Sequence, residues 1–139
     1  MTTFESEIKK VECDDKVIFD TLSNLNNLEK IIDRIPQDKI KDLEYDCDSC
    51  SFSVDPVGKV GLRIVDIEPC KTIKFGADNA PVDFNLWLQV KQVAENDSRI
   101  KVTMKAELPM MLKMMASKPL TEFVNKLAEA LSQLPYKSI

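Results

Sequence analysis

Two cysteines with the spacing of metal ligands are the first residues in this sequence whose types could do chemistry. Cys47 and Cys50 are separated by two residues, a spacing found in zinc sites and in thiol–disulfide motifs. A structural zinc site needs four ligands, but Cys13 and Cys70 stand singly and the chain contains no histidine. A redox motif would need a helix N-terminus, whereas turn residues surround this pair. The sequence favours two cysteines of a turn, with redox sensing and metal binding as the lesser alternatives.

Polar residues in apolar strand positions are the next candidates. Ser6, Tyr45 and Asp66 each share a predicted strand face with apolar neighbours. Buried polar groups need partners, so these side chains could orient a ligand or bond to each other and to nearby backbone. Asp66 could be a carboxylate with acid–base capacity, but no second such residue pairs with it. Because P-loop, dinucleotide, nucleophile-elbow and HExxH motifs are absent, the sequence predicts no catalytic residue, no metal and no cofactor.

Four methionines lie close together before the last helical segment. Met110, Met111, Met114 and Met115 fall within six positions. Methionine is flexible and polarisable, and it suits surfaces that accept varied apolar shapes. This segment could line or gate the mouth of a cavity, with Pro119 as the break that lets it move, or it could fill the core beneath a kinked helix.

The composition is that of one globular domain over residues 1–139. Hydrophobic residues make up 44% of the chain and charged residues 30%, with a net charge of −4. The lysines are interleaved with acids, so neither nucleic-acid binding nor binding to an anionic membrane surface is expected. No apolar segment approaches the roughly 20 residues that span a bilayer, so no membrane insertion is expected. The first residues lack the apolar stretch of a signal peptide, and we therefore expect a cytoplasmic protein in which the cysteines are free thiols.

The order of predicted elements is a strand, two short helices, about six strands and a long helix. Apolar residues at helical spacing predict short helices over about residues 14–23 and 25–35, the second ended by Pro36. Trp87 has the opposite phase to its apolar neighbours and should lie on the outer face, as a dimer contact or as a partly covered surface aromatic. Period-two alternation predicts strands over residues 4–11, 40–46, 52–54, 60–67, 73–76, 84–90 and 100–106.

The end of the chain switches to helical spacing. From Leu120 to Leu134 the apolar residues form one stripe on a helix, opposite a polar face. Fifteen helical residues span roughly 22 Å, enough to cross several strands. A separate helical piece begins at Pro109, and Pro119 should kink or break the helix between the two pieces.

These patterns resemble the helix-grip superfamily, which includes the START domains, the Bet v 1-type allergens and the polyketide cyclases. Residues 17–24 (VIFDTLSN) resemble the first helix of the bacterial members. Residues 61–69 and 72–75 resemble their central hairpin, and residues 120–134 resemble their grip helix. The resemblance implies an α+β fold in which a curved antiparallel sheet of about seven strands, with two short helices, holds the long C-terminal helix across its concave face. It also implies a cavity between helix and sheet, which in relatives holds lipids, sterols, polyketides or hormones.

The leading hypothesis is therefore binding or carriage of a small hydrophobic molecule, lipid or polyketide-like. One alternative is an enzyme of the cyclase or dehydratase kind that uses Asp66 and Tyr45 in the same cavity. Another is a protein-interaction module, including a possible homodimer, that uses the outer face of the sheet or Trp87. The predicted cavity-lining residues are Tyr45, Leu62, Ile64, Asp66, Phe75, Leu86, Leu88, Met104, Met111, Met115 and Phe123.

Overall fold

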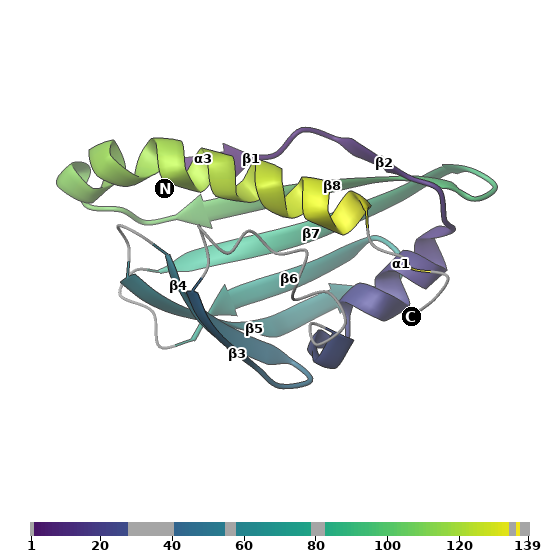
Figure 1. Ribbon diagram of the computed structural model, residues 1–139, viewed down its shortest axis with the longest axis horizontal. Helices are drawn as coiled ribbons and strands as arrows, with labels where there is room; N and C mark the ends of the chain where they lie inside the picture. The colour runs from purple at the N-terminus through teal and green to yellow at the C-terminus, as the bar shows by residue number, and fades with distance from the viewer. Residues whose placement is uncertain (1, 28–40, 55–57, 79–82, 134–135, 137–139) are drawn as a thin grey trace.

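The computed structural model describes residues 2–27, 41–54, 58–78, 83–133 and 136, which build a curved sheet with helices against it. The elements, drawn in Figure 1, are β1 (Thr2–Glu5), β2 (Lys9–Val11), α1 (Asp15–Leu22), the 3-10 helix η1 (Leu25–Asn27), β3 (Lys41–Tyr45), β4 (Ser49–Val54), β5 (Gly58–Glu68), β6 (Thr72–Ala77), β7 (Phe84–Ala94), β8 (Asp97–Ala106) and α3 (Met110–Ser132).

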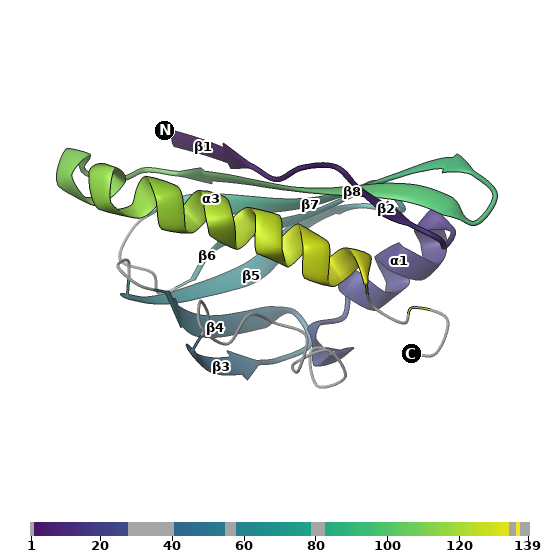
Figure 2. The ribbon, with the colours of Figure 1, turned by 45° about the horizontal axis from the view of Figure 1, so that its top comes forward.

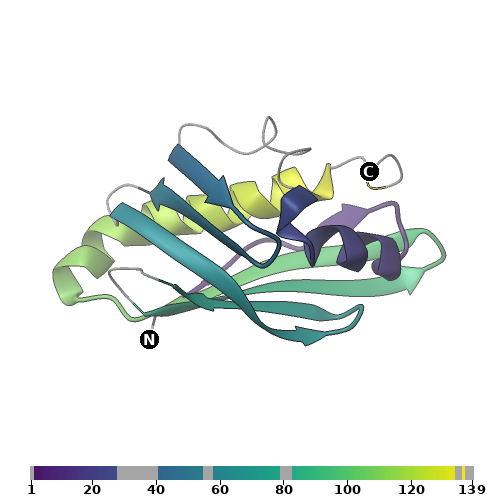
Figure 3. The ribbon, with the colours of Figure 1, turned by 90° about the horizontal axis from the view of Figure 1, so that it is seen from below.

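The sheet has a simple antiparallel topology. The strand order is β1-β8-β7-β6-β5-β4-β3, and β2 also pairs with β8. Figures 1 and 2 show α3 lying across the concave side of the sheet. In Figure 3, α1 lies at the end of the sheet where α3 finishes. The predicted α+β helix-grip fold is confirmed, with eight strands among the described residues rather than seven.

The extra strand arises because the first predicted strand is interrupted. The pairing with β8 moves from Glu5–Thr103 to Lys9–Ile100, so four steps along the N-terminal segment oppose three along β8. This one-residue excess is a bulge, and it reverses which side chains face the core. Ile8, which simple alternation placed inward, is consequently 64% exposed.

The predicted helix over residues 14–23 is confirmed as α1, and its N-terminus is bound to the β7–β8 hairpin. The Asp14 carboxylate accepts the Asn96 backbone N–H at 2.9 Å and the Gln92 amide at 3.1 Å, rather than capping its own helix. Of the helix predicted over residues 25–35, only the start, now η1, lies within the described residues.

The predicted break at Pro119 is wrong, because α3 runs through the proline without interruption. An internal proline costs a helix about 3 kcal/mol. The same helix face is buried on both sides of the proline, from Ala116 and Leu120 through to Leu131. Each buried leucine contributes about 1.5–3 kcal/mol, so packing on the sheet offsets the cost of the proline.

The outward position of Trp87 is confirmed. It pairs across the ladder with Lys74 and Thr103 on the outer face of the sheet. The ammonium groups of Lys74 and Lys105 lie 5.6 and 5.8 Å from the centroid of the indole ring. These cation–π contacts cover an aromatic surface that would otherwise face water.

Gly61 permits a close approach between β5 and the end of β6. The Asp78 backbone N–H donates to the Gly61 carbonyl at 2.8 Å. A Cβ atom at position 61 would lie only 2.0 Å from the Asp78 carbonyl oxygen, so any other residue would force the backbone apart.

We predict that Gly61→Ala lowers the free energy of unfolding by about 1–3 kcal/mol or more, because a backbone atom cannot yield as a side chain can. The control is Gly76→Ala, whose added Cβ would meet side-chain atoms alone, the nearest being a Val65 methyl at 3.1 Å. Urea unfolding measures both variants. An equal cost for the two, or no cost for Gly61→Ala, would contradict the close-approach argument.

Candidate functional site

A small apolar cavity lies between the concave face of the sheet and the C-terminal half of α3. Its volume is about 90 Å³. Its walls come from every layer of the fold, and the described residues that line it are Thr21, Leu22, Asn24, Leu25, Asn27, Leu43, Cys50, Phe52, Leu62, Phe75, Leu86, Leu88, Phe123, Leu127 and Leu131.

Antiparallel pairing places the floor residues side by side. Phe75 on β6 pairs directly with Leu86 on β7, and Leu62 on β5 pairs with Cys50 on β4. Since side chains alternate along each strand, these four face the same side of the sheet. The floor is thus a continuous apolar surface built from four strands.

Two phenylalanines connect the floor to the roof. Phe52 projects from β4 and Phe123 from α3, and their ring centroids lie 6.0 Å apart with an angle of 40° between planes. This is the separation of a favourable tilted aromatic pair. Both rings line the cavity and both residues are only 5% exposed, so the pair supports the helix above the sheet and limits the space beneath it.

The third wall comes from α1 and η1 and carries the few polar groups of the lining. The Thr21 hydroxyl donates to the Val17 carbonyl at 2.9 Å, and the Asn27 amide donates to the Thr21 carbonyl at 2.8 Å. The Leu25 backbone N–H donates to the Cys47 carbonyl at 2.9 Å, which ties η1 to the β3–β4 turn. These bonds occupy the Thr21 hydroxyl and the Asn27 amide N–H with backbone carbonyls, and the remaining lining side chains are mostly apolar.

The cavity offers no charged group in the part of the chain that the structure describes. Its lining contains no aspartate, glutamate, lysine, arginine or tyrosine. Burial raises the pKa of the Cys50 thiol to about 12, so this side chain stays protonated and neutral at physiological pH. The lining can bind apolar surface, but it provides no acid or base for proton transfer.

Five of the predicted lining residues do line this cavity: Leu62, Phe75, Leu86, Leu88 and Phe123. Two more belong to the packed interior beside it. Met104 is buried opposite Phe4 and Leu86 in the ladder, and Ile64 is half-buried against the core.

The inward placement of Asp66 is wrong. In the β5–β6 ladder, Ile64 pairs with Phe75 but Asp66 pairs with the next residue, Lys74, so Val65 is an extra residue. This bulge shifts the phase by one position and turns Asp66 to the outer side. Its carboxylate is exposed and accepts the Ile67 backbone N–H at 2.9 Å.

Tyr45 and Ser6 also lie outside the cavity. Tyr45 pairs with Cys50 in the ladder but lines a separate polar hollow, together with Glu44 and Asp46. Ser6 is buried, accepts the Val102 backbone N–H at 2.8 Å and is fully occupied by backbone. The residues on which a cyclase-type reaction depended, Asp66 and Tyr45, are therefore not brought together in the cavity.

The methionine segment neither roofs the cavity nor fills the core. Met111 and Met115 are 78% and 60% exposed. The cause is the uninterrupted helix, because α3 continues through Pro119 and carries its first two turns away from the cavity. The nearest α3 residue of the lining is Phe123, eight residues or about 12 Å further along.

Several lining residues were not predicted from the sequence. For some of them, the apolar periodicity of their element already indicates that they face inward. Leu127 and Leu131 belong to the apolar stripe of the closing helix, and Phe52 to an alternating strand. Leu22 and Leu25 lie on α1 and η1, whose place against the sheet is a tertiary feature. Periodicity identifies the inward face of each element, but it does not reveal which end of that face is left unfilled.

The two cysteines with metal-like spacing occupy different environments. Cys47 is exposed in the turn, whereas Cys50 belongs to β4 and faces the cavity. Among the described residues, no group of three histidine, cysteine, aspartate or glutamate side chains is placed to hold a metal ion.

The fold of this chain is similar to that of known proteins, although its sequence is not. No protein-family model matches the chain, and no curated protein matches it either. Solved structures do match over nearly its whole length. The protein TTHA0849 from Thermus thermophilus superposes with a TM-score of 0.70 and 14% identity, covering 95% of each chain.

Two further structures are similar. Norcoclaurine synthase from Thalictrum flavum, in complex with dopamine and hydroxybenzaldehyde, has a TM-score of 0.71 at 14% identity and covers 99% of this chain and 88% of that one. A START superfamily protein from Mycobacterium smegmatis has a TM-score of 0.62 at 14% identity, with 94% of each chain covered. The chain therefore has the helix-grip fold of the START and Bet v 1-like proteins, as its sequence patterns predicted.

We predict that iodoacetamide at pH 8 alkylates Cys47 at least about a hundredfold faster than Cys50 in the folded protein. Thiolate is the reacting species, and because burial raises the pKa of Cys50 to about 12, this buried thiol supplies very little thiolate at pH 8. Peptide mass spectrometry over time measures both rates. Unfolding in urea should abolish the difference, and equal rates in the native state would contradict the burial of Cys50.

Proposed function

We propose that the chain binds a small, uncharged apolar molecule, the size of one aromatic ring or a short aliphatic chain, in the cavity beneath α3. The observation that carries this proposal is the lining, which is apolar and free of ionised side chains on all of its described walls. An ionised ligand would lose its hydration there without gaining a partner, which costs several kcal/mol.

The volume of the cavity sets the size class of the ligand. Pockets for drug-sized ligands measure about 300–1,000 Å³. An apolar cavity of about 150 Å³ in an engineered protein admits benzene. At about 90 Å³, the present void is too small for a sterol or a long acyl chain and slightly too small for a single ring. A ring is therefore accommodated in part through the open side of the pocket and in part by movement of one wall.

The wall formed by η1 is the one that yields in this proposal. The sheet is held by continuous ladders and α3 by its buried stripe, whereas η1 has three residues and a backbone bond from Leu25 to Cys47. A short 3-10 segment has fewer bonds to break than a ladder. The norcoclaurine synthase of the same fold, solved with dopamine and hydroxybenzaldehyde, supports single-ring molecules as the first class to test.

We predict that benzaldehyde and toluene raise the midpoint of thermal unfolding, whereas the charged analogues benzoate and benzylammonium do not. At a ligand concentration of about 100 Kd the gain is about 2.7 kcal/mol, equivalent to several degrees for a domain of this size. Scanning calorimetry measures the shift. Native mass spectrometry should show a one-to-one adduct, and equal stabilisation by benzaldehyde and benzoate would contradict an uncharged cavity.

A variant that fills the cavity provides the matched control. Leu127 is partly buried on the cavity side of α3, and Leu127→Phe adds a ring where the void now lies. We expect this variant to lose the thermal shift from every uncharged ligand while its own unfolding midpoint changes by no more than a few degrees. Retention of the wild-type shift would place the ligand elsewhere.

A variant that enlarges the cavity should change the ligand size. Phe52→Ala removes one ring of the pair that limits the space, and we expect it to cost about 3–5 kcal/mol of stability. The enlarged cavity should bind naphthalene, which the wild-type cavity should reject. Isothermal titration calorimetry measures the naphthalene affinity of both proteins, and a wild-type protein that binds naphthalene as tightly as the variant would refute the size limit.

A further inference from the structure

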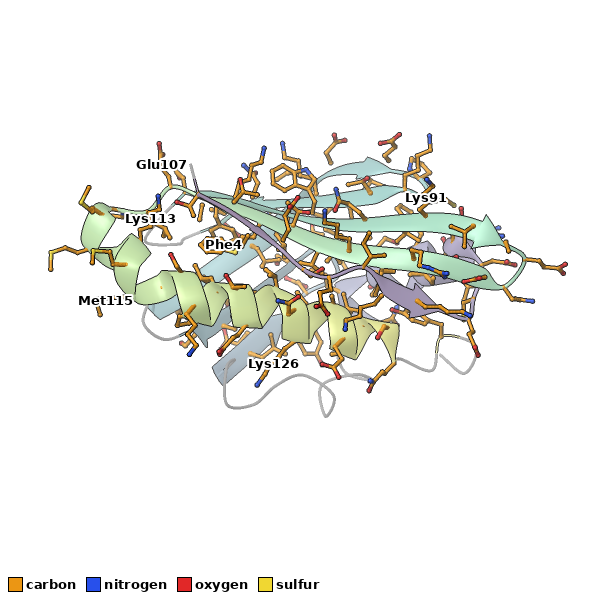
Figure 4. All side chains as sticks on the ribbon, turned by 90° about the horizontal axis from the view of Figure 1, so that it is seen from above. Phe4, Lys91, Glu107, Lys113, Met115 and Lys126 are labelled. Carbon is orange, nitrogen blue, oxygen red and sulfur yellow. The ribbon has the colours of Figure 1, made fainter. Side chains whose placement is uncertain are left out.

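The first two turns of α3 expose an apolar surface for which the fold gives no reason. Met110, Met111, Met114 and Met115 are 79%, 78%, 79% and 60% exposed. We call these four residues the methionine tip. Figure 4 shows the labelled Met115 on the end of α3 that projects away from the sheet, with Lys113 and Glu107 nearby.

The methionine tip lies on the face of α3 that is opposite to the core. At 100° per residue, positions 110, 111, 114 and 115 form one stripe, whereas the buried Ala116 and Leu120 lie on the other side of the helix. Beyond Pro119 the solvent face is polar, as Thr121 and Glu129 illustrate. Only the projecting turns therefore combine an apolar solvent face with an apolar core face, a pattern typical of a helix that is covered on all sides.

Two lysines beside the methionine tip have no acidic partner among the described residues. Lys113 and Lys118 are exposed and form no ion pair within the described part of the chain, and Glu107 precedes the helix. The first turn of α3 carries no acidic residue. Although lysines and acids are interleaved along the sequence, the projecting end of α3 thus combines an exposed apolar surface with these two lysines.

The size of the projection decides between kinds of partner. Six residues of helix form a cylinder about 9 Å long and 10–12 Å wide, with a lateral surface of roughly 300 Å². A stable protein–protein interface needs roughly 800 Å² from each partner. Two copies meeting tip to tip would also bring their lysines together. A lipid surface has no such area requirement, because apolar side chains need only reach below the headgroups.

We propose that the methionine tip docks on a bilayer that contains anionic lipids. The four methionine side chains enter the boundary between headgroups and acyl chains, and Lys113 and Lys118 extend to the lipid phosphates. This docking is peripheral: among the described residues, no helix is long and apolar enough to cross a membrane. It does not depend on the cavity, whose α3 lining begins eight residues further on.

The test is flotation of the purified full chain with large unilamellar vesicles. Vesicles of phosphatidylcholine are compared with vesicles in which about one-third of the lipid is phosphatidylglycerol. We expect binding to the anionic vesicles at about 0.1 M salt and at least several-fold less binding to the neutral ones. No enrichment on either vesicle above a lipid-free control would overturn the proposal.

Variants separate docking from nonspecific adsorption. Replacing all four methionines of the tip with serine should lower the vesicle partition coefficient at least about tenfold. The matched control, Ile8→Thr with Val93→Thr, changes residues that are 64% and 50% exposed elsewhere on the surface, and it should bind as the wild type does. Equal binding of the serine variant and the wild type would overturn the assignment to the tip.

A second variant and a second readout keep the result clear if the serine variant fails to fold. Lys113→Glu with Lys118→Glu leaves the methionines in place and should abolish binding to anionic vesicles. Analytical ultracentrifugation without lipid should show that the wild type and both variants have the same mass. A wild-type dimer that dissociates only in the serine variant would overturn the lipid proposal in favour of a second copy of the chain.

Discussion

Burial of one long stripe of α3 against a curved sheet is the constraint on which the rest of this structure depends. A helix of 23 residues is about 34 Å long, and the curved sheet does not cover it equally along its length (Figure 1). On its inner face, Ala116, Val124 and Ala128 are fully buried. Towards the C-terminal end the sheet leaves the small cavity, and towards the N-terminal end the helix outruns the sheet. The void and the projecting methionines thus have one geometric origin.

Irregular positions in the strands make the curvature possible and decide what faces the cavity. The extra residue at Val65 bends β5 and turns Asp66 away, and the missing side chain at Gly61 lets two backbone segments meet. The bulge at Val65 removes a carboxylate from the interior, so the lining that the described residues form is uncharged. In this protein, the chemistry of the site follows from strand register as much as from residue type.

Periodic patterns predicted the fold class, the positions of the strands in outline, α1 and the closing helix, because burial of apolar side chains imposes period two or 3.6 on the sequence. The errors occur where one residue breaks the period. Asp66 and Ile8 follow bulges, which leave no composition signal, and Pro119 sits in a helix whose packing outweighs the cost of the proline. Met111 and Met115 were assigned to the interior because they are apolar, yet their exposure is set by how far α3 extends beyond the sheet.

The pairing of β1 with β8 has a consequence for how the chain assembles. Thr2 is the ladder partner of Ala106, so β1 cannot pair until β8, which is synthesised about 100 residues later, is available. Until β1 and β2 pair with it, β8 is the edge strand of the sheet, and its free backbone groups are exposed in the nascent chain. Since long-range pairings of this kind slow folding, we expect the β1–β8 ladder to form late, and a bulky extension fused to the N-terminal segment to slow folding further.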